Sequence, residues 1–461
     1  MRTTRRYAHG LLLTALGLLL ASPVLAADPS GKATLEADPT APANFVWVLV
    51  AAFLVFFMQP GFALLEAGLT RAKNTVNILT KNVLDFCMAA LAFWAFGYAL
   101  MFGGSGMAPG LEQGNPFIGY SGFFLTGEAY DVSTILYWLF QMVFAATAAT
   151  IVSGAMAERT KVTAYLAYSF LVSALIYPIY GHWVWGSGWL GEMGAVDFAG
   201  SGVVHAVGGI LALIGAKKLG PRIGKYDEQG RPRPIPGHNL ALATLGVFIL
   251  FFGWFGFNAG STVAATELRI SVIATNTALA AVAGGVAAMY LTMIRTGHVD
   301  LLATGNGILA GLVAITAPCA FVAPWAAVVI GALGGVVMLW AAHFVEHTLK
   351  IDDPVGAFAV HGAAGLFGVL AVGIFADGTY GVSGLIVGDT HQLLVQLISI
   401  VALVLWTSLT GWLLFTLLDK TMGLRVSREH ELAGLDVTEH GVSAYVFENG
   451  LAEKSGKMVG A

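Results

Sequence analysis

Long apolar segments alternate with short polar connections along most of this chain. Eleven segments are long enough, or nearly so, to cross a hydrocarbon layer of roughly 30 Å as helices of about 20 residues. They lie near residues 44–66, 82–104, 131–156, 161–182, 199–219, 237–259, 269–294, 300–318, 323–346, 354–376 and 391–419. The pattern predicts an all-α polytopic membrane protein with eleven transmembrane helices, of which 199–219 and 300–318 are the shortest.

The composition agrees with this pattern and excludes several protein classes. Of 461 residues, 57% are hydrophobic and 11% are charged, whereas soluble domains carry about 25% charged residues. A soluble enzyme is therefore excluded, and we expect no enzymatic activity. The net charge of −4 provides no basic face for nucleic acid. The two cysteines cannot form a disulfide framework.

The N-terminal segment and the distribution of Lys and Arg residues together predict the orientation of the chain. Residues 1–26 combine a basic start, a short apolar core and small residues, which is typical of a cleaved signal peptide. The alternative, a first spanning helix, is disfavoured because the apolar core is short and Pro23 follows it. On the resulting topology, 18 of the 23 Lys and Arg residues lie on the inner side. We expect an N-out, C-in domain over 44–419 and a cytoplasmic tail over 420–461.

Two predicted spans share a motif that hydrophobicity does not require. Asp197 and Asp353 are each followed eight residues later by a histidine, His205 or His361, and then by a glycine. The predicted topology runs the two spans in opposite directions, which indicates an inverted repeat of five plus five helices with one extra helix. Each aspartate can cap a helix N-terminus. Each histidine then lies about 12 Å inward, so the two can meet near the midplane.

This histidine pair has several interpretations. Two unrelated buried histidines remain an alternative, but paired intramembrane ionisable groups usually line a pathway. Two neutral rings can share one hydrogen bond, which suits a small polar molecule or a proton. A metal site is disfavoured because further ligands are missing, and we expect no metal or cofactor. A bis-histidine haem remains conceivable, although the glycine-rich surroundings favour close helix contact.

Aromatic and polar residues gather near the outer ends of three predicted spans. Trp185 lies in a glycine-rich turn before Asp197, while Gln141, Phe144, Phe257 and Ser261 lie on outer halves of other spans. Aromatic faces and a hydroxyl can hold a cation, with about 0.5–2 kcal/mol from each cation–π contact. Each residue on its own equally fits the core or the interfacial aromatic belt.

Six segments together carry a family resemblance. They are MQPGFALLEAGLTRAKN (58–74), GAMAERTK (154–161), DFAGSGVVH (197–205), GWFGFNAGS (253–261), DDPVGAFAVHGAAG (352–365) and GLDVTEHGVSAY (434–445). In order and spacing they resemble the ammonium transporter family, specifically the bacterial Amt branch of the Amt/Rh proteins. The resemblance extends from about Asn44 to Tyr445.

The resemblance implies roles for the outer residues. Phe144, Trp185 and Ser261 would form an outer site that binds the substrate cation, and Asp197 would be the buried carboxylate that organises it. Phe144 and Phe257 would be the stacked rings that gate the pore. Below them, the two histidines of the repeat would line the pore.

The same resemblance implies the transported substrate and the partners. We expect selective uptake of ammonium or ammonia, with methylammonium as a further candidate, after deprotonation at the outer site. A homotrimer in the bacterial inner membrane, serving nitrogen assimilation and regulated by a cytoplasmic PII-type protein, would fit. The tail has Val442 where many relatives have Glu, which weakens the PII prediction, and Glu66 receives no role. An ammonium sensor with little net flux is the alternative function.

Overall fold

The structure, a computed structural model, describes residues 27–445. The predicted signal peptide, residues 1–26, and the end of the predicted tail lie outside the described residues. Within them, ten helical segments are long and apolar enough to cross a membrane, and α14 (Leu301–Thr316) is a shorter apolar helix. The chain is therefore a multi-pass helical membrane protein, and the count of eleven spans stays a prediction.

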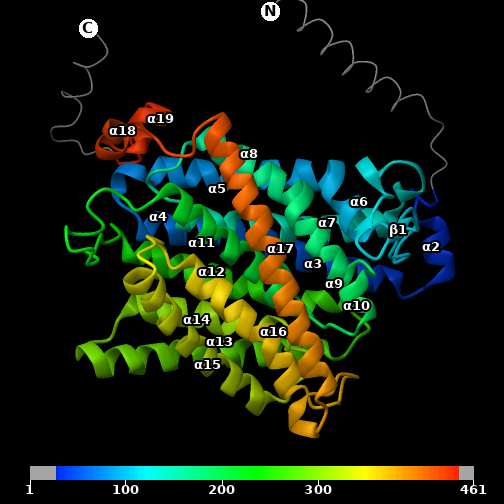
Figure 1. Ribbon diagram of the computed structural model, residues 1–461. Coiled ribbons are helices and arrows are strands. Elements are labelled where there is room, and N and C mark those ends of the chain that lie inside the picture. The colour runs from blue at the N-terminus through cyan, green and yellow to red at the C-terminus, as the bar shows by residue number, and fades with distance from the viewer. Residues whose placement is uncertain (1–26, 446–461) are drawn as a thin grey trace, which may run out of the picture.

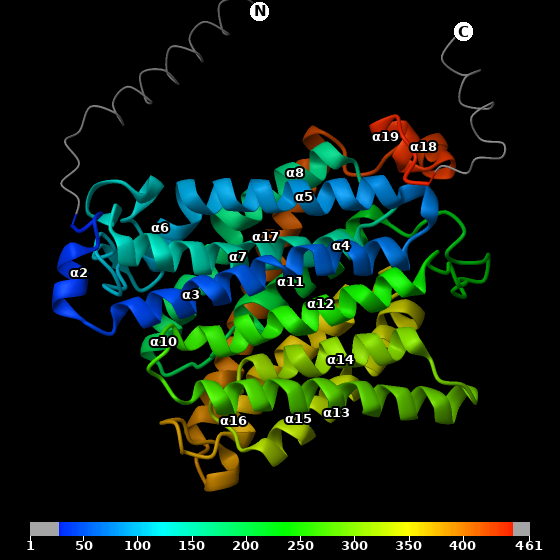
Figure 2. The same ribbon diagram turned by 180° about the vertical axis from the view of Figure 1, so that it is seen from behind.

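Most elements of the first half lie in the upper part of Figures 1 and 2, below α18 and α19. In chain order they are α2 (Lys32–Ala37), α3 (Ala41–Phe56), α4 (Met58–Leu69), η1 (Ala72–Asn74), α5 (Thr75–Ala92), η2 (Phe93–Gly97), α6 (Tyr98–Phe102), β1 (Gly114–Asn115), β2 (Ile118–Gly119), η3 (Phe123–Leu125), η4 (Gly127–Ala129), α7 (Val132–Ala155), α8 (Val162–Leu171), η5 (Val172–Ile176), α9 (Tyr177–Trp185), α10 (Trp189–Glu192), η6 (Ser201–Ala206) and α11 (Val207–Leu219). The strands β1 and β2 pair antiparallel, with Gly114 opposite Gly119.

The second half begins after a long polar connection. Its elements are α12 (Leu240–Ala259), η7 (Gly260–Thr262), α13 (Ile270–Thr296), α14, α15 (Pro324–His343), η8 (Phe344–Thr348), η9 (Phe358–Ala363), α16 (Ala364–Phe375), η10 (Leu385–Val387), α17 (His391–Thr421), α18 (Arg428–Ala433) and α19 (Leu435–His440). The long helix α17 crosses the bundle obliquely in Figure 1 and packs on α11 and α16. The short helix α19 lies against η1 and the start of α5, and α18 packs on α19.

Glycines let several of these helices approach closely. On α13, Gly284 faces the Gly307 carbonyl of α14 and the Gly331 carbonyl of α15, and a Cβ at Gly284 would collide with them. Small residues at such crossings allow backbone contact where lipid supplies no hydrophobic driving force between helices. This packing explains why glycine is abundant inside apolar segments.

Two sequence-based placements were wrong. Trp185 is the last residue of α9 and not part of a turn, since the turn begins at Gly186. The predicted span 82–104 leaves Lys81 in the preceding inward connection. In the structure Lys81 lies within α5 and is fully buried. The positive-inside rule places charges in loops by default. The rule does not consider buried carboxylates such as Glu66, whose negative charge attracts the Lys81 ammonium inside the bundle.

Candidate functional site

The two repeat aspartates cap the helices that carry the histidines. The Asp197 carboxylate accepts four backbone N–H groups, from Gly200, Ser201, Gly202 and Val203, at 2.8–2.9 Å. These are N–H groups that a helix N-terminus leaves without partners. A carboxylate there also interacts favourably with the helix dipole.

Asp353 repeats this arrangement at the second helix. Its carboxylate accepts N–H groups from Gly356, Ala357 and Phe358 at 2.9–3.1 Å. The two matching caps confirm the prediction that each motif aspartate caps the N-terminus of the helix that carries the histidine. They fix where each helix starts, and so how deep each histidine lies.

The two histidines meet. Nδ1 of His205 lies 3.2 Å from Nδ1 of His361, and the ring centroids are 5.3 Å apart. Both rings are buried, with 0% and 4% of their surface exposed. Since an Nδ1–Nδ1 hydrogen bond needs one donor and one acceptor, at least one ring must be neutral at that nitrogen.

Each histidine lies on a wide, π-helical turn, η6 or η9, and the two helices cross closely beside them. A Cβ at Gly209 would collide with the Gly362 backbone, and one at Gly365 with the Ser201 carbonyl. The motif glycines therefore bring the two helices into backbone contact. Single π-turns inside α-helices are common at functional sites.

Aromatic rings surround the His205 side of the pair. His205 stacks on Trp254, with centroids 5.0 Å apart, and on Phe257, at 5.2 Å. Its Nε2 has no hydrogen-bond partner among the described residues. On the other side, Phe62 lies 5.8 Å from the His361 ring. An unpaired ring nitrogen in an aromatic enclosure can hydrogen-bond a small polar molecule.

The outer aromatic residues continue this row. Phe144 packs against Phe257 with centroids 4.1 Å apart and planes tilted by 30°, and Trp185 meets Phe144 edge-on at 6.3 Å. The Trp185 indole donates its N–H to the Asp197 carbonyl at 2.6 Å, which ties the tryptophan to the helix cap. Ser261 donates its hydroxyl to the Phe257 carbonyl at 2.7 Å.

The predicted residues thus form one series of contacts, from Trp185 through Phe144 and Phe257 to His205 and His361. Gln141 lies one turn before Phe144 and donates to the Tyr137 hydroxyl at 3.1 Å.

Two contacting residues were missed by sequence reasoning, Trp254 and Phe62. Trp254 was detectable, because it precedes Phe257 by three residues and shares its helix face. Phe62 lies within a quoted motif, but nothing in the sequence places it against His361.

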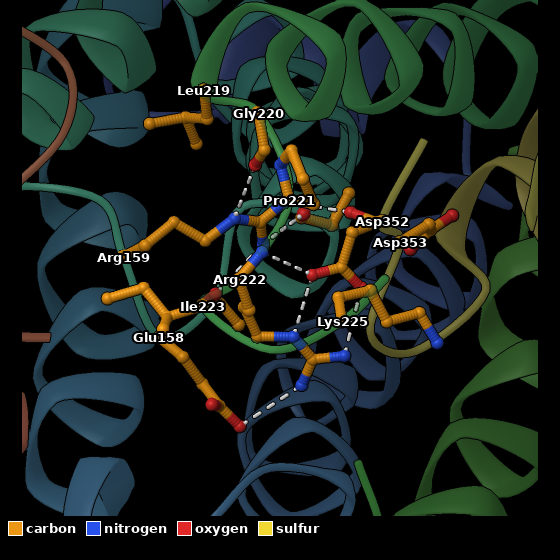
Figure 3. Close-up of polar contacts among 12 residues, drawn as sticks. Glu158, Arg159, Leu219, Gly220, Pro221, Arg222, Ile223, Lys225, Asp352 and Asp353 are labelled. Carbon is orange, nitrogen blue, oxygen red and sulfur yellow. Dashed lines mark hydrogen bonds and ion pairs between the residues drawn. The ribbon is translucent and has the colours of Figure 1, made fainter. Parts of the chain in front are cut away.

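A buried ion-pair cluster lies beside the Asp353 cap, which we call the inner cap after its predicted orientation (Figure 3). Arg222 binds Asp352 through its Nε at 2.8 Å and its Nη2 at 3.0 Å, and its Nη1 lies 3.3 Å from Glu158. Arg159 donates to the Asp352 carbonyl at 2.7 Å. Burial alone would raise the pKa of the Asp352 carboxyl, but the hydrogen bonds from Arg222 and the charges of Arg159 and Arg222 outweigh it and lower the pKa to about 2.

Comparisons with known proteins agree with the resemblance seen in the sequence. The model of the Ammonium Transporter Family matches residues 46–445. The ammonium transporter Amt2 of Archaeoglobus fulgidus is 54% identical over 446 residues, covering 93% of this chain and 93% of that protein. Ammonium transporter Amt1 of Haloferax mediterranei is 42% identical over 438 residues, covering 89% and 81%.

Solved structures share the fold. A structure described as a sensor Amt protein superimposes with a TM-score of 0.81 at 40% identity, covering 87% of this chain and 99% of that one. Candida albicans Mep2 superimposes with a TM-score of 0.76 at 30% identity, covering 84% and 87%. The chain belongs to the ammonium transporter family.

Proposed function

We propose that this protein takes up ammonium through the path formed by the outer aromatic residues and the histidine pair. Ammonium loses its proton at the outer site, and ammonia then passes the histidines. The observation that carries this proposal is the 3.2 Å contact between two buried histidines, of which His205 packs on Phe257 and so adjoins the Phe144–Phe257 ring pair.

Deprotonation provides selectivity that size cannot. Ammonium and potassium have the same charge and nearly the same radius, so a pore that fits one fits the other. Moving an intact ion into an apolar passage costs tens of kcal/mol by idealised solvation estimates, whereas a neutral polar molecule costs roughly 2–7 kcal/mol. Potassium has no proton to lose and stays excluded.

The outer cation site consists of Phe144, Trp185 and Ser261. The faces of the two aromatic rings attract a cation, and the Ser261 hydroxyl can turn from the Phe257 carbonyl to accept an ammonium N–H. Asp197 organises the site without touching the cation. Its two carboxylate oxygens already accept four N–H groups, so the carboxylate contributes the helix cap and its negative charge, while the main-chain carbonyl of Asp197 holds Trp185.

The gate and the pore lining follow from the same contacts. Phe144 and Phe257 close the entrance to hydrated ions, because their closely packed rings offer no polar group that could replace a hydration shell. His205 and His361 line the passage and provide the polar nitrogen atoms that ammonia needs there.

We extend the proposal to the assembly. The chain would cross a bacterial inner membrane eleven times, N-out and C-in, after loss of residues 1–26, and would belong to the bacterial Amt branch. It would form a homotrimer with one pore in each subunit, and a PII-type protein would bind its cytoplasmic face. No metal or cofactor is needed for this function.

A sensor with little net flux is the second candidate. The observation that favours it is the 40% identity to the structure described as a sensor Amt protein. Flux measured in vesicles that contain the purified protein distinguishes a transporter from a sensor, because a sensor would bind ammonium without moving it across the membrane.

The proposal is tested in liposomes by recording charge displacement and lumen pH after an ammonium jump. We expect a sustained ammonium-evoked current or, for neutral ammonia, alkalinisation of the lumen without current, and we expect His361→Ala to abolish transport or make it unselective. If neither signal depends on the protein, the transport proposal fails.

A further inference from the structure

Three ionisable residues that the proposed path does not use are buried beside its inner half. Glu66 on α4 is 2% exposed, and Lys81 and Asp85 on α5 are 0% exposed. All three lie within segments expected to cross the membrane. Charged residues there are costly and usually mark a proton or ion route.

A hydrogen-bond network joins the two carboxylates to polar neighbours. Asp85 accepts the Gln59 amide at 2.6 Å and the Tyr165 hydroxyl at 2.7 Å. Glu66 accepts the Asn82 amide at 3.1 Å.

The two halves of this network are connected. The Thr150 hydroxyl donates to the side-chain amide oxygen of Asn82 at 3.1 Å and accepts an N–H of the Gln59 amide at 3.2 Å. The carboxylates of Glu66 and Asp85 therefore belong to one polar cluster between α4, α5, α7 and α8.

Lys81 is the unusual member of the cluster. Its ammonium is buried without a hydrogen-bond partner among the described residues, and it lies 5.6 Å from the centre of the Tyr165 ring. Since Tyr165 binds Asp85, the ammonium points into the network. Glu66 is the main attracting charge, with Asp85 and the half-exposed Glu439 of α19 adding to it, while Arg159 opposes it. Tyr165 and Tyr168 face the cluster from α8.

The charges of the cluster do not balance in their ordinary ionisation states. Two carboxylates and one ammonium sum to −1, and a buried charge without compensation is unfavourable. One added proton brings the sum to zero. We propose that Glu66, Lys81 and Asp85 form a buried proton-binding site that holds one proton, on either of its two carboxyl groups, at neutral pH.

The site is placed beside the histidine pair. Gln59, Phe62 and Glu66 lie on one face of α4, because they are spaced three and four residues apart. Phe62 contacts His361, so the network runs past the pair from one helical turn above this contact to one turn below it.

Resting on the proposed function, the site has a role in transport. It releases its proton to the inner water and becomes −1, and it then takes up the proton that ammonium leaves behind and returns to zero. Each cycle thus moves one proton separately from one ammonia molecule, and no other reactant is needed.

Infrared spectroscopy of the purified protein at neutral pH tests the site itself, by the carbonyl stretch of protonated carboxyl groups. We expect Asp85→Asn and Glu66→Gln each to lose one such group, because the remaining carboxylate then balances Lys81. Lys81→Met should gain one, and the double variant Lys81→Met, Asp85→Asn should match the wild type. The exposed Glu192→Gln is the matched control and should change nothing.

Two outcomes would overturn the proton site. If Asp85→Asn and Glu66→Gln lose no protonated carboxyl, both groups are ionised. If Lys81→Met gains none, Lys81 is neutral and the charge balance is different. The double variant guards against misfolding, because an unfolded protein would not restore the wild-type spectrum.

Ammonium-evoked current tests the role in transport. We expect at least a fivefold lower current in Asp85→Asn and no change in Glu192→Gln. An unchanged Asp85→Asn current, with the infrared result as expected, overturns the role in transport. Absence of transport in the wild type would instead refute the proposed function, while the infrared result still decides the proton site.

Discussion

The two aspartate caps both accept the free N–H groups of a helix N-terminus, but their surroundings differ. Asp197 accepts four N–H groups and has aromatic neighbours, and its carboxylate takes part in no ion pair within residues 27–445. Asp353 accepts three N–H groups and follows Asp352, which Arg222 and Arg159 bind.

Under the proposed function, this difference would correspond to the entry and the exit of the path. A carboxylate without a counter-ion keeps a negative field that attracts a cation to the outer aromatic site. Asp353 also takes part in no ion pair among the described residues, but Arg222 and Arg159 bind its neighbour Asp352, so positive charge lies beside the inner cap and would disfavour a cation there. The two halves of the repeat begin the histidine helix with the same aspartate cap, and they differ in the charged side chains that surround this cap.

The largest effect is expected at the outer cap. Asp197→Ala removes the acceptor of four buried N–H groups and the outer negative charge, so we expect ammonium current to fall at least 100-fold. Each unsatisfied buried donor costs about 1–3 kcal/mol, so the unfolding temperature should also drop. Current per folded protein, with folding checked by size-exclusion chromatography, measures the effect. Normal transport in folded Asp197→Ala would refute the role of this carboxylate.

The inner cluster should contribute stability. Arg222→Met leaves Asp352 and Glu158 buried without this partner, and breaking a buried ion pair costs about 3–5 kcal/mol. Thermal unfolding in detergent should show the loss, while ammonium selectivity in the folded fraction is retained. A variant that is as stable as the wild type but conducts potassium would reverse the assignment.

The inner cluster should also make stability depend on pH. The pKa of Asp352 is lowered from 3.8 to about 2 in the folded protein, so its stabilising contribution is present above pH 4 and is lost as the pH falls toward 2. The shift corresponds to about 2 kcal/mol. Unfolding temperatures measured between pH 5 and pH 2 should show this loss, and it should be smaller in Asp352→Asn.

The smallest effect is expected at the outer tryptophan. Trp185→Leu removes one aromatic face worth about 0.5–2 kcal/mol, so the ammonium concentration for half-maximal current should rise about 2- to 30-fold. The maximal current should change less. Trp183→Leu, a tryptophan two residues earlier on α9, is the matched control. Equal effects of the two substitutions would indicate a packing role only.

Local sequence patterns predicted the helices and the histidine contact. The eight-residue spacing from Asp197 to His205, and from Asp353 to His361, fixes the depth of each ring once the aspartate caps the helix. The outer site depended on the family resemblance, because the spacing of Phe144, Trp185 and Ser261 alone equally fits core packing.

The inner cluster could not be predicted, for a physical reason. Arg222 meets Glu158 across 64 residues and Asp352 across 130, and no periodicity connects such positions. Lys81 was misplaced for a related reason, since its burial depends on a carboxylate of another helix. Long-range charge pairing is decided by helix packing, which the hydropathy pattern does not encode.

We propose that ammonium loses its proton before it crosses. Comparing ammonium entry with potassium entry tests this step, because potassium matches ammonium in size and charge but has no proton to lose. Vesicles containing the protein should be exposed to equal jumps of ammonium and potassium while nitrogen or potassium entry is measured. We expect ammonium entry with no potassium entry above that of empty vesicles. Potassium entry at a rate comparable to that of ammonium would show that intact cations cross, and would contradict deprotonation before crossing.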